Sequence, residues 1–128
     1  MLSEFPVAPT LPIVDVARAK KFYSEKLGLK MVQEHPAGIR YACGNGTSIW
    51  LYPRSTATKS DATSFRFEVK DVVKEVADLK KKGVVFEEYD MPGLKTVNNI
   101  VTDGDVKGAW FKDSEGNIIA ITQGMEWP

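Results

Sequence analysis

The chain has 128 residues, with 17 basic and 17 acidic side chains, so its formal net charge at neutral pH is zero. That length corresponds to one domain, or to two small modules that share one core. The charge balance argues against nucleic-acid binding, because there is no basic excess to neutralise phosphates. No segment approaches the roughly 20 apolar residues of a membrane span, so no membrane partner is expected.

The cysteine and histidine counts limit the kinds of site that the chain can build. The single cysteine, Cys43, excludes an internal disulfide, and its place at a strand end is typical of a small buried residue. The single histidine, His35, is typical of an exposed turn, although a role as a base stays open. The N-terminus lacks a basic start followed by an apolar run, so we expect no secretory signal and a cytoplasmic protein.

The first half of the sequence predicts the order strand, helix, strand, strand, strand. An extended segment over 7–13 precedes Asp15, whose side chain suits the start of a helix over 16–26. Gly28 is expected to end that helix in the left-handed conformation. Short strands are expected over 29–34, 39–43 and 48–52, with turns at 35–38 and 44–46.

The second half repeats this order after a small, polar segment over 54–62 that is typical of a linker. A strand is predicted over 64–69 and a helix over 71–82, which Gly83 ends. A long loop over 90–105 has two open interpretations, a lid or a connector. The remaining strands are expected over 84–89, 107–112 and 117–123.

An internal repeat connects the two halves. Val14 and Val69 are 55 residues apart, and so are Gly28 and Gly83. The repeated element order at one offset predicts two tandem βαβββ modules, over 7–53 and 63–123, within a single domain of residues 1–128.

Short motifs accompany this repeat: Val14-Asp15-Val16, Phe22-Tyr23, Leu27-Gly28-Leu29, Val69 to Val72, Lys82-Gly83-Val84 and Trp110-Phe111-Lys112-Asp113-Ser114-Glu115-Gly116-Asn117. With these motifs, the tandem arrangement resembles the vicinal oxygen chelate superfamily, which includes glyoxalases, bleomycin resistance proteins and extradiol dioxygenases. The resemblance implies an α+β fold, with two curved mixed sheets around a cavity, the helices outside, and commonly a dimer.

The resemblance also indicates where metal ligands would lie. Metal-dependent relatives carry one ligand in each of four strands, and the matching positions here are Ala8, Trp50, Ser64 and Ala120. Alanine and tryptophan offer no lone pair to a divalent ion, and a neutral serine hydroxyl is a poor ligand. We therefore expect no metal and no cofactor, and we assign no catalytic residue. The alternative is a lyase or dioxygenase of the same superfamily whose metal ligands lie elsewhere.

Side chains of a strand alternate between its two faces, which divides the strand residues into two sets. The apolar set is expected beneath the helices: Leu11, Ile13, Ile49, Leu51, Phe65, Phe67, Ile119 and Ile121. The other set is expected to bind a small organic ligand: Thr10, Ser48, Trp50, Tyr52, Ser64, Arg66, Glu68, Trp110 and Thr122. A solvated sheet face would give the same pattern, and that alternative stays open.

Arg66 is the one cation that this division places in the cavity, and its forked donors suit an anionic or aromatic ligand. Glu68, two residues further on, is an alternative partner that would neutralise Arg66. The function predicted from the sequence is a metal-independent, bleomycin-resistance-like binding protein. We also expect a homodimer, because exposed sheet edges are usually covered. A third hypothesis is an interaction subunit whose dimer surface is its function.

Overall fold

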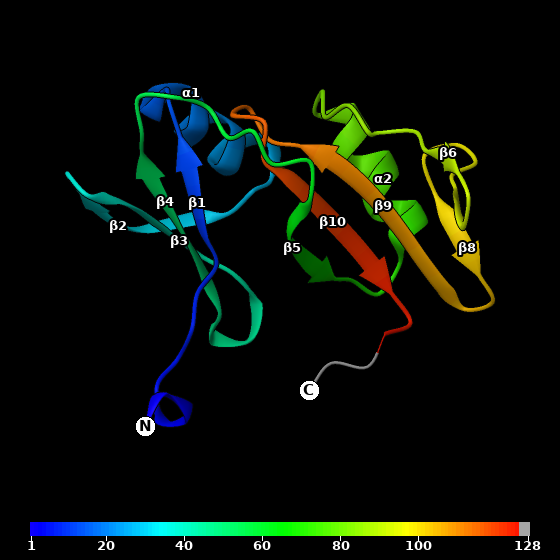
Figure 1. Cartoon of the computed structure of the whole chain (residues 1–128), viewed down its shortest axis with the longest axis horizontal. Coiled ribbons are helices and arrows are strands. Elements are labelled where there is room, and N and C mark those ends of the chain that lie inside the picture. Colours follow the sequence, from blue (N-terminus) through cyan, green and yellow to red (C-terminus); the bar gives the residue numbers. More distant parts are fainter. Residues whose placement is uncertain (126–128) are drawn as a thin grey trace.

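The computed structural model describes residues 1–125 and contains two four-stranded sheets, one from each half of the chain (Figure 1). Parallel pairing of β1 with β4 and of β5 with β10 makes both sheets mixed, and the other pairs are antiparallel. The first sheet has the order β1-β4-β3-β2, with β1 (Thr10–Ile13), β2 (Lys30–His35), β3 (Gly38–Ala42) and β4 (Ser48–Pro53). The second has the order β5-β10-β9-β8, with β5 (Thr63–Glu68), β8 (Val101–Asp103), β9 (Val106–Lys112) and β10 (Ile118–Gln123). The tandem α+β architecture expected from the sequence is confirmed.

Each module carries one principal helix, α1 (Val16–Lys21) or α2 (Val72–Lys81), and both begin at an aspartate. The carboxylates of Asp15 and Asp71 accept the N–H groups of Arg18 and Lys74, as residues that cap helices do. Short 3₁₀ turns, η1 (Leu2–Glu4) and η3 (Gly44–Gly46), lie outside these helices. No helix within residues 1–125 is long and apolar enough to cross a membrane.

The predicted α-helix over 16–26 is wrong in its second half, where a π-helical turn, η2 (Phe22–Lys26), replaces it. Gly28 follows Asp15 by 13 residues, whereas Gly83 follows Asp71 by only 12. A π turn accommodates one extra residue, and it lets the neighbouring side chains of Phe22 and Tyr23 both be buried. The repeat offset is therefore 55 at the glycines but 56 at the caps, so the match of Val14 with Val69 is one residue out of register.

The region after α2 also differs from the prediction. The expected strand over 84–89 forms only an isolated bridge between Phe86 and Phe111. The Asn99 amide donates to the carbonyl oxygens of Phe86 and Glu87, so a side chain meets part of the hydrogen bonding that a strand partner would supply. Within the predicted loop over 90–105, β6 (Asp90–Met91) pairs with β7 (Leu94–Lys95), and β8 becomes the fourth strand of the second sheet.

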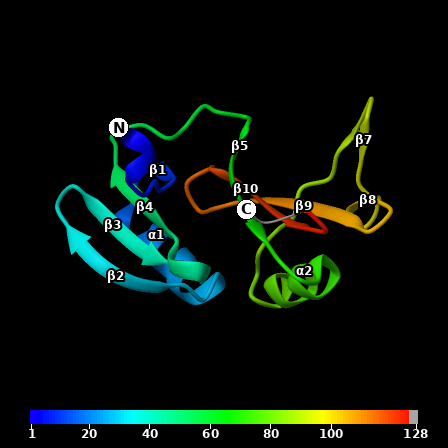
Figure 2. The same cartoon turned by 90° about the horizontal axis from the view of Figure 1, so that it is seen from below.

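The alternation of strand side chains is confirmed for most of the core. Leu11, Ile13, Ile49, Leu51, Ile119 and Ile121 are buried, whereas Phe65 and Phe67 are only half-buried. Figure 2 shows α1 and α2 on the same side of their sheets. A single apolar cluster runs through both modules, and the rings of Phe22 and Phe111 meet across their boundary with centroids 6.3 Å apart.

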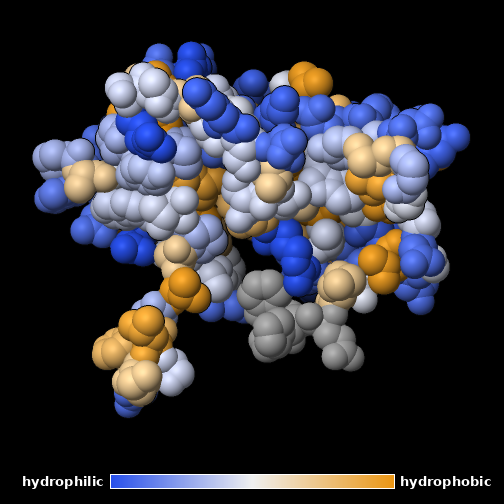
Figure 3. Space-filling view, in the orientation of Figure 1, coloured by the Kyte–Doolittle hydropathy of each residue, from blue (hydrophilic) through white to orange (hydrophobic). Residues whose placement is uncertain are grey.

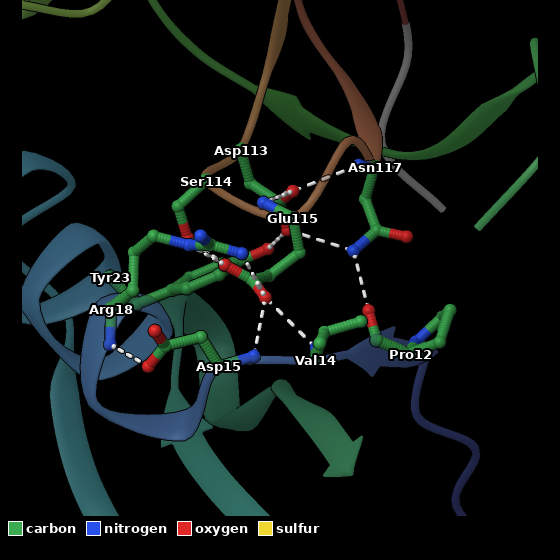
Figure 4. A network of polar contacts seen from close by, with 9 residues as sticks. All are labelled: Pro12, Val14, Asp15, Arg18, Tyr23, Asp113, Ser114, Glu115 and Asn117. Atoms are coloured by element: carbon green, nitrogen blue, oxygen red, sulfur yellow. Dashed lines mark hydrogen bonds and ion pairs between the residues drawn. The ribbon is translucent and has the colours of Figure 1, made fainter. Parts of the chain in front are cut away.

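A polar network, here called the inter-module clasp, joins the β9–β10 turn to the start of the first module (Figure 4). It consists of Pro12, Val14, Asp15, Arg18, Tyr23, Asp113, Ser114, Glu115 and Asn117. The fully buried Glu115 carboxylate accepts the N–H groups of Val14 and Asp15, at 2.9 and 2.8 Å, and Nε of Arg18 at 2.8 Å.

A second carboxylate completes the clasp. Asp113 accepts the Tyr23 hydroxyl at 2.6 Å and the N–H groups of Glu115 and Asn117 at 2.8 Å each. The Asn117 amide donates to the Pro12 carbonyl oxygen at 2.9 Å. Because these donors and acceptors come from both modules, the clasp fixes the position of one module against the other.

The two helix-ending glycines generate the first prediction. Gly28 and Gly83 have φ values of +70° and +88°, as expected from the sequence, and replacing either with alanine should destabilise the fold by about 1–2 kcal/mol. Gly44→Ala is the matched control, because Gly44 has no positive φ and open space where a Cβ would lie. Urea unfolding measures all three. Equal stabilities of the Gly28→Ala and Gly44→Ala proteins would contradict the proposed role of the glycine.

The second prediction concerns pH. Burial raises the pKa of Glu115, but hydrogen bonds from Arg18, Asp15, Ser114 and Val14 outweigh that effect and hold it at about 2, below its ordinary 4.5. The carboxylate therefore contributes about 3 kcal/mol of stability above pH 4.5, which is lost as the pH falls towards 2. Glu115→Gln should lower the free energy of unfolding at pH 6 and flatten its dependence on acid.

Urea unfolding between pH 6 and pH 2.5 measures this slope. Asp78→Asn is the control, because Asp78 lies on the surface, where its ion pair with Lys74 contributes little. A Glu115→Gln protein with the acid dependence of the parent would show that other groups are responsible.

Candidate functional site

A hollow of about 330 Å³, here called the inter-module cleft, lies between β5 and the β3–β4 turn. Figure 3 shows apolar surface between the two halves of the molecule, in the region that separates the sheets. The first module lines the cleft with Pro9, Cys43, Gly44, Asn45, Thr47, Ser48 and Ile49, and the second with Phe65, Arg66, Phe67 and Glu68. Two modules therefore build one cavity, and the clasp sets the distance between its walls.

The second-module wall is aromatic. The rings of Phe65 and Phe67 meet edge to face, with centroids 5.3 Å apart. The sequence placed both residues beneath the helix, but β5 is an edge strand, so both of its faces border the cleft. This position is the physical reason that these side chains stay half-buried.

Arg66 lines the cleft, and it is paired with Glu68, the alternative partner that the sequence offered. Its Nη1 donates to Glu68 Oε2 at 2.5 Å and to the Thr122 hydroxyl at 2.8 Å. Thr122 in turn donates to the same carboxylate oxygen, at 2.8 Å. Glu68 is largely buried, with 14% of its side chain exposed. The pair gives the cleft one donor group and one acceptor group without net charge.

A second group of expected residues lies on the outer face of the first sheet. Trp50 on β4 is flanked in register by Thr10 on β1 and by Arg40 on β3, and Tyr52 follows it on the same face. The Trp50 ring covers Gly38, where a Cβ would come within 2.6 Å of the indole. Ser48, which also borders the cleft, connects this face to it.

Sequence reasoning missed Arg40, which lies beside Trp50 in the β3–β4 register and does not line the cleft. The alternation of side chains along β3 could have revealed this residue, because Ile39 and Tyr41 on either side are buried and Arg40 therefore lies on the opposite face. The guanidinium lies over the Trp50 ring, 5.4 Å from the ring centroid. It also donates to Ser48 Oγ at 2.8 Å and to Gln33 Oε1 at 3.3 Å.

The remaining candidates lie elsewhere. Trp110 packs against Tyr89, with ring centroids 5.5 Å apart, and Ser64 is exposed at the start of β5; neither borders the cleft. His35, expected in a turn, is instead the last residue of β2, where it pairs with Gly38, and its exposed side chain accepts the Ala37 N–H with Nδ1. The segment over 90–105 cannot serve as a lid for the cleft, because β8 lies at the opposite edge of the sheet from β5.

The four positions that correspond to metal ligands do not fit a divalent ion. Ala8, Trp50 and Ala120 lack a suitable donor atom, and the Ser64 hydroxyl is exposed. Within residues 1–125, no cluster of three or more His, Cys, Asp or Glu side chains is arranged to hold a metal. Cys43 borders the cleft and is half-buried rather than buried, and burial raises the pKa of its thiol.

Comparison with known proteins agrees with this fold. An uncharacterised protein, YetH of Bacillus subtilis (strain 168), is 26% identical over 119 residues, which cover 87% of this chain and 91% of that protein. The crystal structure of TnmS3, an antibiotic binding protein from Streptomyces sp. CB03234, superposes with a TM-score of 0.66 at 23% identity, covering 93% of this chain and 96% of that one.

A fosfomycin resistance protein, FosX from Listeria monocytogenes, gives a TM-score of 0.72 at 12% identity, covering 94% of this chain and 93% of that one. The family model described as Glyoxalase/Bleomycin resistance protein/Dioxygenase superfamily matches residues 7–121. The chain therefore belongs to the glyoxalase/bleomycin resistance protein/dioxygenase superfamily.

Proposed function

We propose that the protein binds a small, polar aromatic molecule in the inter-module cleft, without a metal ion. The observation that carries this proposal is the pairing of the Phe65–Phe67 wall with the Arg66–Glu68 ion pair in one cavity. Small-molecule sites are commonly apolar cavities of about 300–1,000 Å³ with a few well-placed polar groups. The cleft, at about 330 Å³, matches the lower end of that range.

Arg66 is proposed as the polar anchor of the ligand. Because Glu68 balances its charge, Arg66 contributes hydrogen bonds rather than an attraction for anions in general. Glu68 accepts from Thr122 and from the Met125 N–H, so the pair stays in place when one Arg66 N–H turns to a ligand. The neighbour TnmS3, named for antibiotic binding, has the same fold, so the fold is compatible with a bound organic molecule.

The proposal includes a two-fold homodimer. Among the described strands, β1 and β5 each pair on one side only, and an open sheet edge favours association. The N-terminal segment extends away from the sheets (Figure 1), and its apolar residues Leu2, Phe5 and Val7 are largely exposed. Such apolar surface is typical of a contact between subunits. The cytoplasmic location expected from the sequence stays a prediction.

Calorimetric titration with 2-naphthamide, a neutral polar aromatic probe, tests the cleft. Phe67→Ala and Arg66→Ala should each weaken binding about tenfold, through the lost ring contact and the lost hydrogen bond. Phe67→Leu, which keeps most of the apolar volume, should bind more tightly than Phe67→Ala. Val85→Ala is the control, because Val85 is 80% exposed and lies outside the cleft.

The titration is made with a chelator present, since the proposal requires no metal. Unchanged affinity in both the Phe67→Ala and the Arg66→Ala proteins would contradict the cleft. Binding that requires an added divalent ion would favour the alternative, a metal-dependent lyase or dioxygenase of the same superfamily.

A further inference from the structure

Arg40 lies within ion-pair distance of no carboxylate in the part of the chain that the structure describes. Arg18 is paired with Glu115 and Arg66 with Glu68. Arg40 donates Nε to the amide oxygen of Gln33 and Nη1 to the hydroxyl of Ser48, and both acceptors are neutral. Within residues 1–125, Arg40 therefore forms no ion pair.

The hydrogen bonds of Arg40 also leave some of its guanidinium N–H groups without an acceptor. A guanidinium has five N–H groups, and these two bonds account for one on Nε and one on Nη1. Neither N–H of Nη2 has an acceptor among the described residues. Two adjacent terminal nitrogens with free N–H groups match the two oxygens of a carboxylate.

Contacts with neighbouring side chains hold the Arg40 guanidinium in place. Arg40 lies directly opposite Trp50 in the β3–β4 register, and its guanidinium lies over the indole within cation–π distance. The absence of a side chain at Gly38 lets the indole lie close against β3. Ser48 and Gln33 fix the guanidinium from the sides. A half-buried cation held in this way loses little conformational entropy when it binds an anion.

We propose that Arg40 and Trp50 form a carboxylate subsite, and that the ligand of this protein is an aromatic acid. Ser48 touches Arg40 and also borders the cleft, so the subsite adjoins the cavity lined by Phe65 and Phe67. The aromatic ring of the ligand lies in the cleft, and its carboxylate accepts from the free N–H groups of Arg40. This inference rests on the proposed function and adds the charge of the ligand.

A pair of probes with the same ring separates charge from shape. 2-Naphthoate carries a carboxylate where 2-naphthamide carries a neutral amide. The parent protein should bind the acid at least about tenfold more tightly than the amide, because a charge-assisted bidentate contact is stronger than a neutral one. Arg40→Ala should weaken binding of the acid ten- to a hundredfold, roughly, and leave binding of the amide nearly unchanged.

Two further variants sharpen the calorimetric test. Arg40→Lys keeps the charge but loses the planar fork, so it should recover only part of the preference for the acid. Arg54→Ala is the matched control, since it removes the same charge from an exposed residue just beyond β4 and should leave both affinities unchanged.

The outcomes distinguish this inference from the function on which it rests. If the parent binds the acid no more tightly than the amide, or if Arg40→Ala weakens both probes equally, the carboxylate subsite is wrong. If Phe67→Ala still weakens binding of the amide, the proposed binding site in the cleft is supported even without the carboxylate subsite. If the amide does not respond to Phe67→Ala, the cleft itself is wrong.

Discussion

The relation between the two modules depends on one buried carboxylate. Glu115 lies in the second module, yet most of the groups that stabilise its charge, the N–H groups of Val14 and Asp15 and the Arg18 guanidinium, belong to the first. If the modules lost this alignment, only the Ser114 hydroxyl would remain as a donor, and a buried charge that loses its partners costs several kcal/mol. Because the cleft has one wall from each module, the contact that holds the modules together also sets the dimensions of the cavity.

The parts of the fold that the sequence predicts well follow from local constraints. A left-handed glycine ends each helix, and period-two alternation separates buried Leu51 from half-exposed Trp50 on one strand. The errors occur where tertiary contacts decide. The π turn at Phe22 depends on two neighbouring rings that both enter the core, and the backbone at Phe86 bonds to the side chain of Asn99, 13 residues away. No local pattern carries that information.

The candidate site also has parts that the sequence predicts and parts that depend on tertiary contacts. The sequence indicated that β4 and β5 supply polar and aromatic residues, and it named Glu68 as a possible partner of Arg66, which the structure shows. It did not place the cleft, because the angle between the modules is set by the clasp and not by any strand pattern. Arg40 was not predicted for a different reason: β3 carries none of the positions that correspond to metal ligands in the superfamily.

The extra residue in the first module makes the two modules different in the side chains with which they contact each other. Counted from the helix caps, the second-module residues that correspond to Phe22 and Tyr23 are Asp78 and Leu79, which have neither the rings nor the hydroxyl that meet Phe111 and Asp113. A molecule assembled from two copies of either module would therefore lack one side of the contact. The two modules share an element order, but their docking has a direction, and the π turn is one place where they are not interchangeable.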